Sequence, residues 1–398
     1  MSHAPSRQDG LGKNSRSKVQ NITGEQVQRL IAKLDVISKF LPKVPFQEIL
    51  TSQDYIIGEA NVDNQGEEGG KHVLQEVSII GHLRRINALN SETTRAIELG
   101  AGTARLSDRL QRSTNATLDH IMIDRQNFAQ NHCRDRHLLA RSEKKVIEQA
   151  REEKTREEKA PVIERVIVDI GSLQLDHYFD NCDDGQVGKK TLCMSKHLCG
   201  PACDLTLHAL SRSVQNSGQC PPPPTAIATC CHYLCTFDSF SGREFWESTG
   251  LSEEDFVVAT AVSQWASLQE KKNKSAKRRK AEKGDTTAGT KDSRNIPQQH
   301  ATSLSDSEAS TLPDLFSVAS LAKKNLEKAM EDLEKDFIPS QEFERHFTRE
   351  EKSLLGIRIK QLFDLSRAAF CQQQLGYKSA ELVIYTTRST ENRLLVLH

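Results

Sequence analysis

Five short apolar runs, alternating with helical patterns from Arg95 onward, constrain the fold of this chain more than any other feature. The runs read RAIELG, DHIMIDR, ERVIVDI, TLCMS and TAIATC. Such alternation is typical of an open parallel sheet whose strands are joined by crossover helices. Two further runs, SAELVIYTT and NRLLVLH, close the chain and are joined by the turn-forming RSTE. We therefore predict an α/β fold with a seven-stranded, mostly parallel sheet and a C-terminal antiparallel hairpin.

Shifts in composition along the chain indicate its domain organisation. Residues 1–20 are polar and predict a disordered N-terminus, whereas 21–93 carry amphipathic patterns that predict a helical extension. We place the first part of the sheet core at 94–268 and its C-terminal helix and hairpin at 350–398. Between them, 269–349 is rich in charge, and we expect a mostly disordered insertion with a helical pattern, LAKKNLEKAMEDLEK, at its far side.

Composition excludes several classes of protein. No run approaches the roughly 20 apolar residues of a membrane span, and the polar start lacks the apolar region of a signal peptide. Ten cysteines in 398 residues are too few for a disulfide framework, so we expect a reducing compartment, cytoplasmic, nuclear or both. The formal net charge is zero, which leaves a nucleic-acid partner open. The basic run KKNKSAKRRK could contact phosphates or direct nuclear import.

The first predicted strand runs into IELGAGTARLSDRL, which has the features of a cofactor loop. Gly100 and Gly102 predict a turn that lets backbone approach a ligand, before a helix whose N-terminus offers free N–H groups. Glu98 stands at the end of this strand. Asp124 ends the second strand, where an acid can bind ribose hydroxyls, and Asp169 ends the third, near an adenine amino group. This order favours an adenosine cofactor, and the E-x-G-x-G form favours S-adenosylmethionine over NAD; acids at exposed strand ends are the alternative.

A second group of residues follows the fourth and fifth predicted strands, in MSKHLCGPACDLTLHAL and AIATCCHYLCT. These strands are expected to be neighbours, so their carboxyl ends face the ligand crevice together. The side chains expected beside the reactive methyl group are Lys196, His197, Cys199, Cys230, Cys231 and His232. Lys196, His197 and His232 are candidates for accepting the proton of the methyl acceptor. Lys71 and His72 are expected to close over the cofactor, and each of these side chains could instead have a structural role.

The cysteines allow more than one interpretation. Cys199, Cys203 and the cysteines of CCHYLC could ligate zinc together with a histidine, but their spacing does not match a C-x2-C pair. One of them could be a covalent nucleophile. Several could be small buried apolar residues, as we expect for Cys193 and Cys203. We therefore assign no metal, and zinc ligation remains an alternative.

Several segments together resemble the eukaryotic tRNA 2′-O-methyltransferase family that modifies position 4 of the acceptor stem. They read KHVLQE, IELGAGTARLS, MSKHLCGPACDLTL, IATCCHYLC and LGIRIKQLFDLSRAAFCQQQLGY, and the resemblance covers 22–268 and 350–398. It implies S-adenosylmethionine as methyl donor, a Rossmann-like class I methyltransferase fold and a tRNA 2′-hydroxyl as acceptor. It places the cofactor loop on Glu98, Gly100 and Gly102. The acceptor-side motifs fall on Lys196, His197, Cys199, Gly200, Cys230, Cys231 and His232.

The sequence departs from the family pattern in two places. Members usually begin with small Cys/His zinc-finger segments, whereas no cysteine precedes Cys133 here, and the insertion at 269–349 is longer than expected. We predict a methyltransferase that modifies the 2′-hydroxyl of nucleotide 4 in the tRNA acceptor stem, with tRNA as partner and no membrane association. The alternatives are a related methyltransferase acting on rRNA or protein, and a non-catalytic RNA-binding or scaffold protein.

Overall fold

The computed structural model describes residues 22–50, 66–127, 135–140, 142–144, 161–178, 190–216, 222–268, 312–336 and 347–398. The chain divides into two compact units. The first, here called the sheet unit, comprises 43–230, 294–312 and 367–398. The second, the helical unit, comprises 1–42, 231–293 and 313–366.

One unit boundary falls after Cys230, within the segment 94–268 that was predicted as the first part of the core. The predicted domain boundaries stay a prediction. The predicted disorder of 1–20 lies outside the described residues, as does that of 269–311. Helix α11 (Leu315–Asp336) occupies the far side of the predicted insertion and contains the charged helical pattern. It packs against other helices of the helical unit, so this part of the insertion belongs to an ordered unit.

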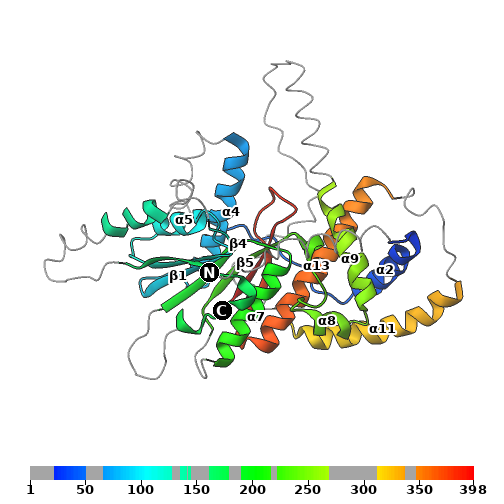
Figure 1. Cartoon of the computed structure of the whole chain (residues 1–398). Coiled ribbons are helices and arrows are strands. Elements are labelled where there is room, and N and C mark those ends of the chain that lie inside the picture. The colour runs from blue at the N-terminus through cyan, green and yellow to red at the C-terminus, as the bar shows by residue number, and fades with distance from the viewer. Residues whose placement is uncertain are drawn as a thin grey trace, which may run out of the picture. The chain divides into compact units, whose positions relative to one another are not determined.

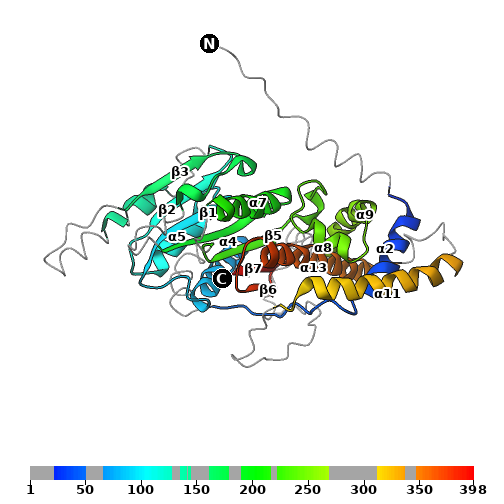
Figure 2. The same cartoon turned by 90° about the horizontal axis from the view of Figure 1, so that it is seen from below.

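The sheet unit contains a seven-stranded sheet in the order β3-β2-β1-β4-β5-β7-β6 (Figures 1 and 2). The strands are β1 (Thr93–Leu99), β2 (Asp119–Asp124), β3 (Ile163–Ile167), β4 (Lys190–Cys199), β5 (Thr225–Cys230), β6 (Ala380–Ile384) and β7 (Arg393–Leu397). Strands β1 to β5 pair in parallel, and β7 runs antiparallel to both β5 and β6. The predicted mixed sheet with its C-terminal hairpin is confirmed.

Helices cover both faces of this sheet. Figure 1 shows α4 (Gly66–Arg85) and α5 (Arg105–Ser113) on one side of the strands and α7 (Pro201–Asn216) on the other. A buried apolar cluster joins α4 and α5 to the strands, and it includes Ile79, Leu83, Leu106, Leu110, Met194 and Val396. Strands buried on both faces read as continuous apolar runs, which explains why β5 was recognisable in the sequence.

The strand order reverses between β1 and β4, since β1 connects onward to β2 while β4 lies on its other side. The carboxyl ends of parallel strands flanking such a switch point form the usual ligand-binding edge of an open α/β sheet. The loops after β1, β2, β4 and β5 all leave from this edge. The predicted cofactor and acceptor segments of the sheet unit therefore share one edge.

The helical unit is built from α2 (Gly24–Ile37), α8 (Arg243–Ser248), α9 (Glu253–Ser263), α11 and the part of α13 (Arg349–Gln374) that ends at Ser366. Short 3-10 turns also occur, at η1 (Ile170–Ser172) and η2 (Asp176–Tyr178) in the sheet unit and at η4 (His232–Leu234) and η5 (Gln264–Ser267) in the helical unit. The core of the helical unit is aromatic. The Trp246 and Phe363 rings stack with centroids 5.4 Å apart, and the Phe256 ring meets Phe363 edge-on with centroids 4.9 Å apart. Among the described helices of the chain, none is long and apolar enough to cross a bilayer.

Candidate active site

The loop after β1 is shaped by glycines and by a buried acid. Gly100 and Gly102 have φ angles of +68° and +51°, which strain residues that carry a side chain. A Cβ on Gly100 would also lie 3.0 Å from the Leu198 side chain. Glu98 is 4% exposed, and its Oε2 accepts hydrogen bonds from the Ser107 N–H at 2.9 Å and hydroxyl at 2.6 Å. The Glu98 carboxyl thus fastens β1 to the first turn of α5.

Burial raises the pKa of Glu98 to about 7, although both hydrogen bonds from Ser107 oppose this shift. A carboxyl in such surroundings is partly neutral near physiological pH. Its observed contacts are with the helix that follows the loop, so the structure gives Glu98 a part in holding the loop in shape. The predicted contact of Glu98 with a cofactor stays a prediction.

Asp124 ends β2 directly beside the glycine loop. Its Oδ2 accepts a hydrogen bond from the Gly102 N–H at 2.8 Å, and its Oδ1 accepts one from the Gln126 N–H at 2.9 Å. Asp169 lies two residues beyond the end of β3, is exposed, and accepts a hydrogen bond from the Gly171 N–H at 2.9 Å. The glycine loop and the acid of the second strand are therefore in contact, and Asp169 follows the adjacent strand at the same edge.

Arg165 on β3 is a loop-fixing residue that the sequence analysis missed. One guanidinium nitrogen donates to the Gly102 carbonyl at 2.9 Å, and the same group pairs with Asp135 at 2.6 Å. The sequence signal was an arginine directly before the apolar residues of the ERVIVDI run. Because its guanidinium contacts the backbone of the glycine loop from the next-but-one strand, Arg165 restricts the position of this loop.

Strand β4 carries an irregularity at the predicted acceptor residues. Its pairing with β5 shifts between Ser195 and Leu198, where β4 contains one more residue than its partner. The extra residue places a bulge at Lys196 and His197. Bulges bend a strand and re-aim side chains, and they are frequent next to active sites. A bulge was not expected from the sequence, which predicted that the strand ended at Ser195.

Lys196 belongs to a buried charged network centred on Glu76 of α4. Its Nζ lies 2.7 Å from Glu76 Oε1 and donates to the His72 carbonyl at 3.2 Å. The other Glu76 oxygen pairs with Arg109 Nε at 2.7 Å, and Arg105 Nε lies 3.6 Å from Oε1. The Glu76 side chain is 1% exposed and that of Lys196 is 7% exposed. Glu76 was missed in the sequence, where its one signal was an acid among the apolar positions of KHVLQEVSII.

The charges in this network shift one another's pKa values. Burial would raise the pKa of Glu76, but Lys196 and Arg109 outweigh it and hold that pKa below its ordinary value. Burial lowers the pKa of the Lys196 ammonium, while Glu76 acts in the opposite direction. Burial and the charge of Lys196 both lower the pKa of His72. The network therefore keeps Glu76 ionised and favours a neutral His72.

His72 and His197 lie side by side next to this network. Their rings meet edge-on with centroids 5.9 Å apart, and His197 is exposed at the bulge. Lys196, His197 and His72 therefore lie together in the sheet unit. The predicted closing of Lys71 and His72 over a cofactor stays a prediction. Together they present one ammonium group and two imidazoles at the carboxyl end of β4.

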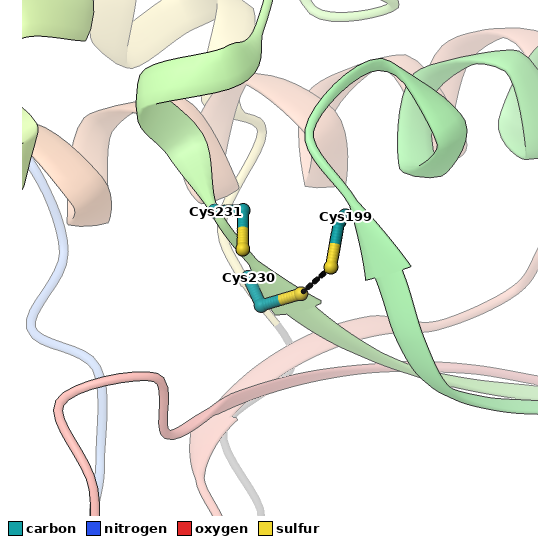
Figure 3. A group of neighbouring side chains, drawn as sticks. All are labelled: Cys199, Cys230 and Cys231. Atoms are coloured by element: carbon teal, nitrogen blue, oxygen red, sulfur yellow. Dashed lines mark hydrogen bonds between the residues drawn. The ribbon is translucent and has the colours of Figure 1, made fainter.

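Cysteines stand opposite one another at the ends of β4 and β5. Cys199 pairs in register with Cys230, and their sulfur atoms are 3.4 Å apart (Figure 3). The Gly200 N–H donates to the Cys230 carbonyl at 3.3 Å. Cys231 follows directly in the chain, and the three sulfur atoms lie within 4.8 Å of one another. The expected meeting of these cysteines is observed, whereas their predicted role beside the substrate stays a prediction.

His232 belongs to the helical unit and is described there. It is 1% exposed, and its Nε2 lies 2.8 Å from Asp364 Oδ1 in a pair buried on both sides. Its ring packs near Phe363 with centroids 5.9 Å apart. These contacts are those of a buried structural histidine, and the predicted catalytic role of His232 stays a prediction.

Comparison with known proteins places this chain in a family. The sequence profile described as Methyltransferase TRM13 matches residues 74–398, which include the glycine loop, the β4 bulge and all seven strands. The chain belongs to this family. The resemblance inferred from the sequence motifs is thereby confirmed.

Curated relatives agree with this assignment. The chain is 29% identical to a "tRNA:m(4)X modification enzyme TRM13" of Schizosaccharomyces pombe over 258 residues, covering 64% of this chain and 62% of that protein. It is 27% identical to a homolog of the same name from Dictyostelium discoideum over 330 residues, covering 82% of this chain and 52% of that protein. A mouse homolog is 24% identical over 94% of this chain and 74% of its own length. The chain thus spans 62% and 52% of the length of the first two relatives.

Proposed function

We propose that this chain is an S-adenosylmethionine-dependent methyltransferase that modifies the 2′-hydroxyl of nucleotide 4 in the acceptor stem of tRNA. The observation that carries the proposal is the match to the Methyltransferase TRM13 family over residues 74–398, which include all seven strands of the sheet. The names of the relatives supply the substrate class and the modified position. The strand order, with β7 antiparallel among otherwise parallel neighbours, supports a Rossmann-like class I methyltransferase fold.

The residues at the edge of the sheet fit an adenosine-containing cofactor. Gly100 and Gly102 leave the backbone of the loop open to close approach. Asp124 touches that loop and can accept further hydrogen bonds from ribose hydroxyls, because each carboxylate oxygen has two acceptor positions. Asp169 is exposed beyond the neighbouring strand, where an adenine amino group could donate to it. Arg165 holds the loop in place from β3.

Further polar groups remain for a ligand beside Lys196. Within the described part of the chain, His72 Nδ1 and Ser195 Oγ are buried and have no hydrogen-bond partner. Buried polar atoms are normally satisfied, and exceptions cluster where a ligand or water belongs. The His72 carbonyl accepts a hydrogen bond from Lys196 Nζ, and Ser195 directly precedes Lys196 in β4, so both groups support a polar ligand near the β4 bulge.

When bound, S-adenosylmethionine supplies a methyl group on a positively charged sulfur. The chain's own residues have to align the acceptor hydroxyl with that group and take up its proton. We assign the alignment to the Lys196 ammonium, which Glu76 holds in one position and which can stabilise negative charge developing on the 2′-oxygen. We assign uptake of the hydroxyl proton to His197, whose imidazole is exposed next to Lys196.

The test is a methyl-transfer assay with purified protein, labelled S-adenosylmethionine and an unmodified tRNA transcript. We expect a 2′-O-methyl group on nucleotide 4, mapped by nuclease digestion and mass spectrometry. A transcript with a single 2′-deoxy nucleotide at position 4 is the matched control and should accept no label. Cofactor binding without transfer to tRNA would contradict the proposal, and label in rRNA or protein would favour the related methyltransferases instead. Residence in the cytoplasm, the nucleus or both stays a prediction from sequence.

A further inference from the structure

The cysteine cluster at the ends of β4 and β5 has a geometry that the proposed methyl transfer does not require. Cys199, Cys230 and Cys231 each place one sulfur atom within 4.8 Å of the other two. Figure 3 shows the three side chains converging from two adjacent strand ends, with the sulfur atoms pointing into the same space. Cys230 is buried, Cys231 is partly buried and Cys199 is exposed, so the cluster is reachable from solvent on one side.

The backbone after both strands is held in the left-handed region. Gly200, which follows Cys199, has a φ of +57°, and Cys231, which follows Cys230, has a φ of +52°. Glycine adopts this conformation freely, whereas a residue with a side chain pays roughly 1–2 kcal/mol. Strain of this kind persists at sites where the position of the side chain is used. Cys231 therefore keeps its thiol beside those of Cys199 and Cys230 with a backbone conformation that glycine would adopt at lower cost.

We propose that Cys199, Cys230 and Cys231 bind one thiophilic divalent cation of the zinc class. In a tetrahedral thiolate site a metal–sulfur distance of about 2.3 Å separates neighbouring sulfur atoms by roughly 3.8 Å. The Cys199 and Cys230 sulfur atoms are 3.4 Å apart, and all three lie within 4.8 Å of one another. Each of these separations is therefore within about 1 Å of the spacing in such a site.

The chemistry of the donors selects the class of ion. Thiolates prefer soft or borderline cations such as Zn²⁺ over the hard cations Mg²⁺ and Ca²⁺. Binding displaces the thiol protons, including the one shared between Cys199 and Cys230, so affinity rises with pH. Three protein ligands leave a fourth position for water or another ligand on the exposed side of Cys199. The ion would tie the loop after β4 to the loop after β5.

The test uses the full chain in which three cysteines outside the described residues, Cys133, Cys182 and Cys220, are replaced by serine. The protein is reduced, stripped with a chelator and titrated with Co²⁺, whose thiolate charge-transfer band reports the number of sulfur ligands. Zn²⁺ is then titrated in competition with a chromogenic chelator. We expect one ion per chain, a band of the strength of three thiolates, and a rise in unfolding temperature on saturation. These readouts need neither tRNA nor S-adenosylmethionine, so they stand apart from the proposed function.

Variants locate the site. Cys199→Ser and Cys230→Ser should each weaken Zn²⁺ binding at least about 100-fold, since losing even an outer-shell partner of a metal ligand costs 10- to 100-fold. Cys193→Ala, within β4 and fully buried, is the matched control and should leave the affinity unchanged. Cys231→Gly keeps the backbone conformation and removes only the thiol, which guards against a folding artefact. The proposal is overturned by substoichiometric binding, by equal affinity in all variants, or by a Cys199–Cys230 disulfide as the stable form under mild reductant.

Discussion

Two of the buried glutamates of the sheet unit, Glu98 and Glu76, contact different kinds of partner near the carboxyl ends of its strands. Glu98, under the glycine loop, is bonded only to the backbone and hydroxyl of Ser107 in the contacts described above, and burial raises its pKa to about 7. Glu76, beneath the β4 bulge, is bonded to Lys196 and Arg109, and these cations hold its pKa below the ordinary value despite burial.

The different partners of Glu98 and Glu76 suit two different roles at the carboxyl ends of the strands. Under the proposed function, the loop that receives an adenosine needs a fixed backbone shape, and a partly neutral buried carboxyl can supply it with less added charge than a fully ionised one. A position that guides an acceptor oxygen needs a fixed charge, and an ammonium group can be buried only with a paired anion. The same residue type therefore serves shape in one region and electrostatics in the other.

Removing the charge of Glu76 should cause the largest change expected here, a loss in the free energy of unfolding. Glu76→Gln leaves Lys196 and Arg109 buried without their shared anion, and breaking a buried pair costs about 3–5 kcal/mol. We expect the free energy of unfolding, measured by urea denaturation at neutral pH, to fall by that amount. Glu98→Gln is the matched control and should be much milder, because the amide keeps a carbonyl oxygen for Ser107. Equal losses for both variants would remove the distinction drawn here.

Lys196→Met should lower turnover by about 10²–10³-fold, the range for loss of one group that stabilises developing charge. Binding of S-adenosylmethionine, measured by calorimetry, should change little, since the glycine loop and Asp124 are untouched. Lys190→Met, at the exposed start of the same strand, is the control and should keep full activity. A Lys196→Met enzyme with normal turnover but weak cofactor binding would place Lys196 on the cofactor side.

The pH dependence of stability should report on Glu98. Its pKa in the folded state is about 7 against an ordinary value of 4.5, so the folded protein holds more protons than the unfolded chain between these values. Stability from this group is therefore greatest at low pH and falls by up to about 3 kcal/mol as pH rises from 4.5 through 7. The amide of Glu98→Gln cannot titrate. The difference in free energy of unfolding between this variant and the parent protein should therefore narrow or reverse between pH 4.5 and 7. A constant difference would show that Glu98 is ionised throughout.

Asp124→Ala should weaken cofactor binding by about 10- to 150-fold, the equivalent of 1.5–3 kcal/mol for hydrogen bonds to a charged group. Asp169→Ala should weaken it less, because this side chain is exposed. Both effects can be measured by calorimetric titration with S-adenosylmethionine. If both variants bind S-adenosylmethionine as tightly as the parent protein does, the assignments of Asp124 to the ribose and of Asp169 to the adenine are both wrong.

Much of the fold could be predicted because its signals are local. Continuous apolar runs mark strands buried on both faces, and helical spacing marks the crossover helices, so the strand count and the terminal hairpin followed from periodicity. The glycine loop was readable because Gly100 and Gly102 take conformations that disfavour side chains. The positions of Asp124 and Asp169 at the carboxyl ends of β2 and β3 could be predicted because parallel strands end at a common edge, whereas their roles stay a prediction. The ends of strands were predicted less accurately than their number: β4 continues to Cys199, whereas the apolar run in the sequence ends at Ser195.

The sequence by itself thus determined the class of sheet, the glycine loop after β1 and the family resemblance. Only the tertiary structure decided which buried charge meets which partner: Glu76 and Lys196 are 120 residues apart, and His232 and Asp364 are 132 apart. The bulge at Lys196 and the facing of Cys199 and Cys230 likewise depend on the register of β4 against β5. Periodicity reflects the geometry of one segment, whereas burial of a charge or a thiol depends on groups that only packing brings together.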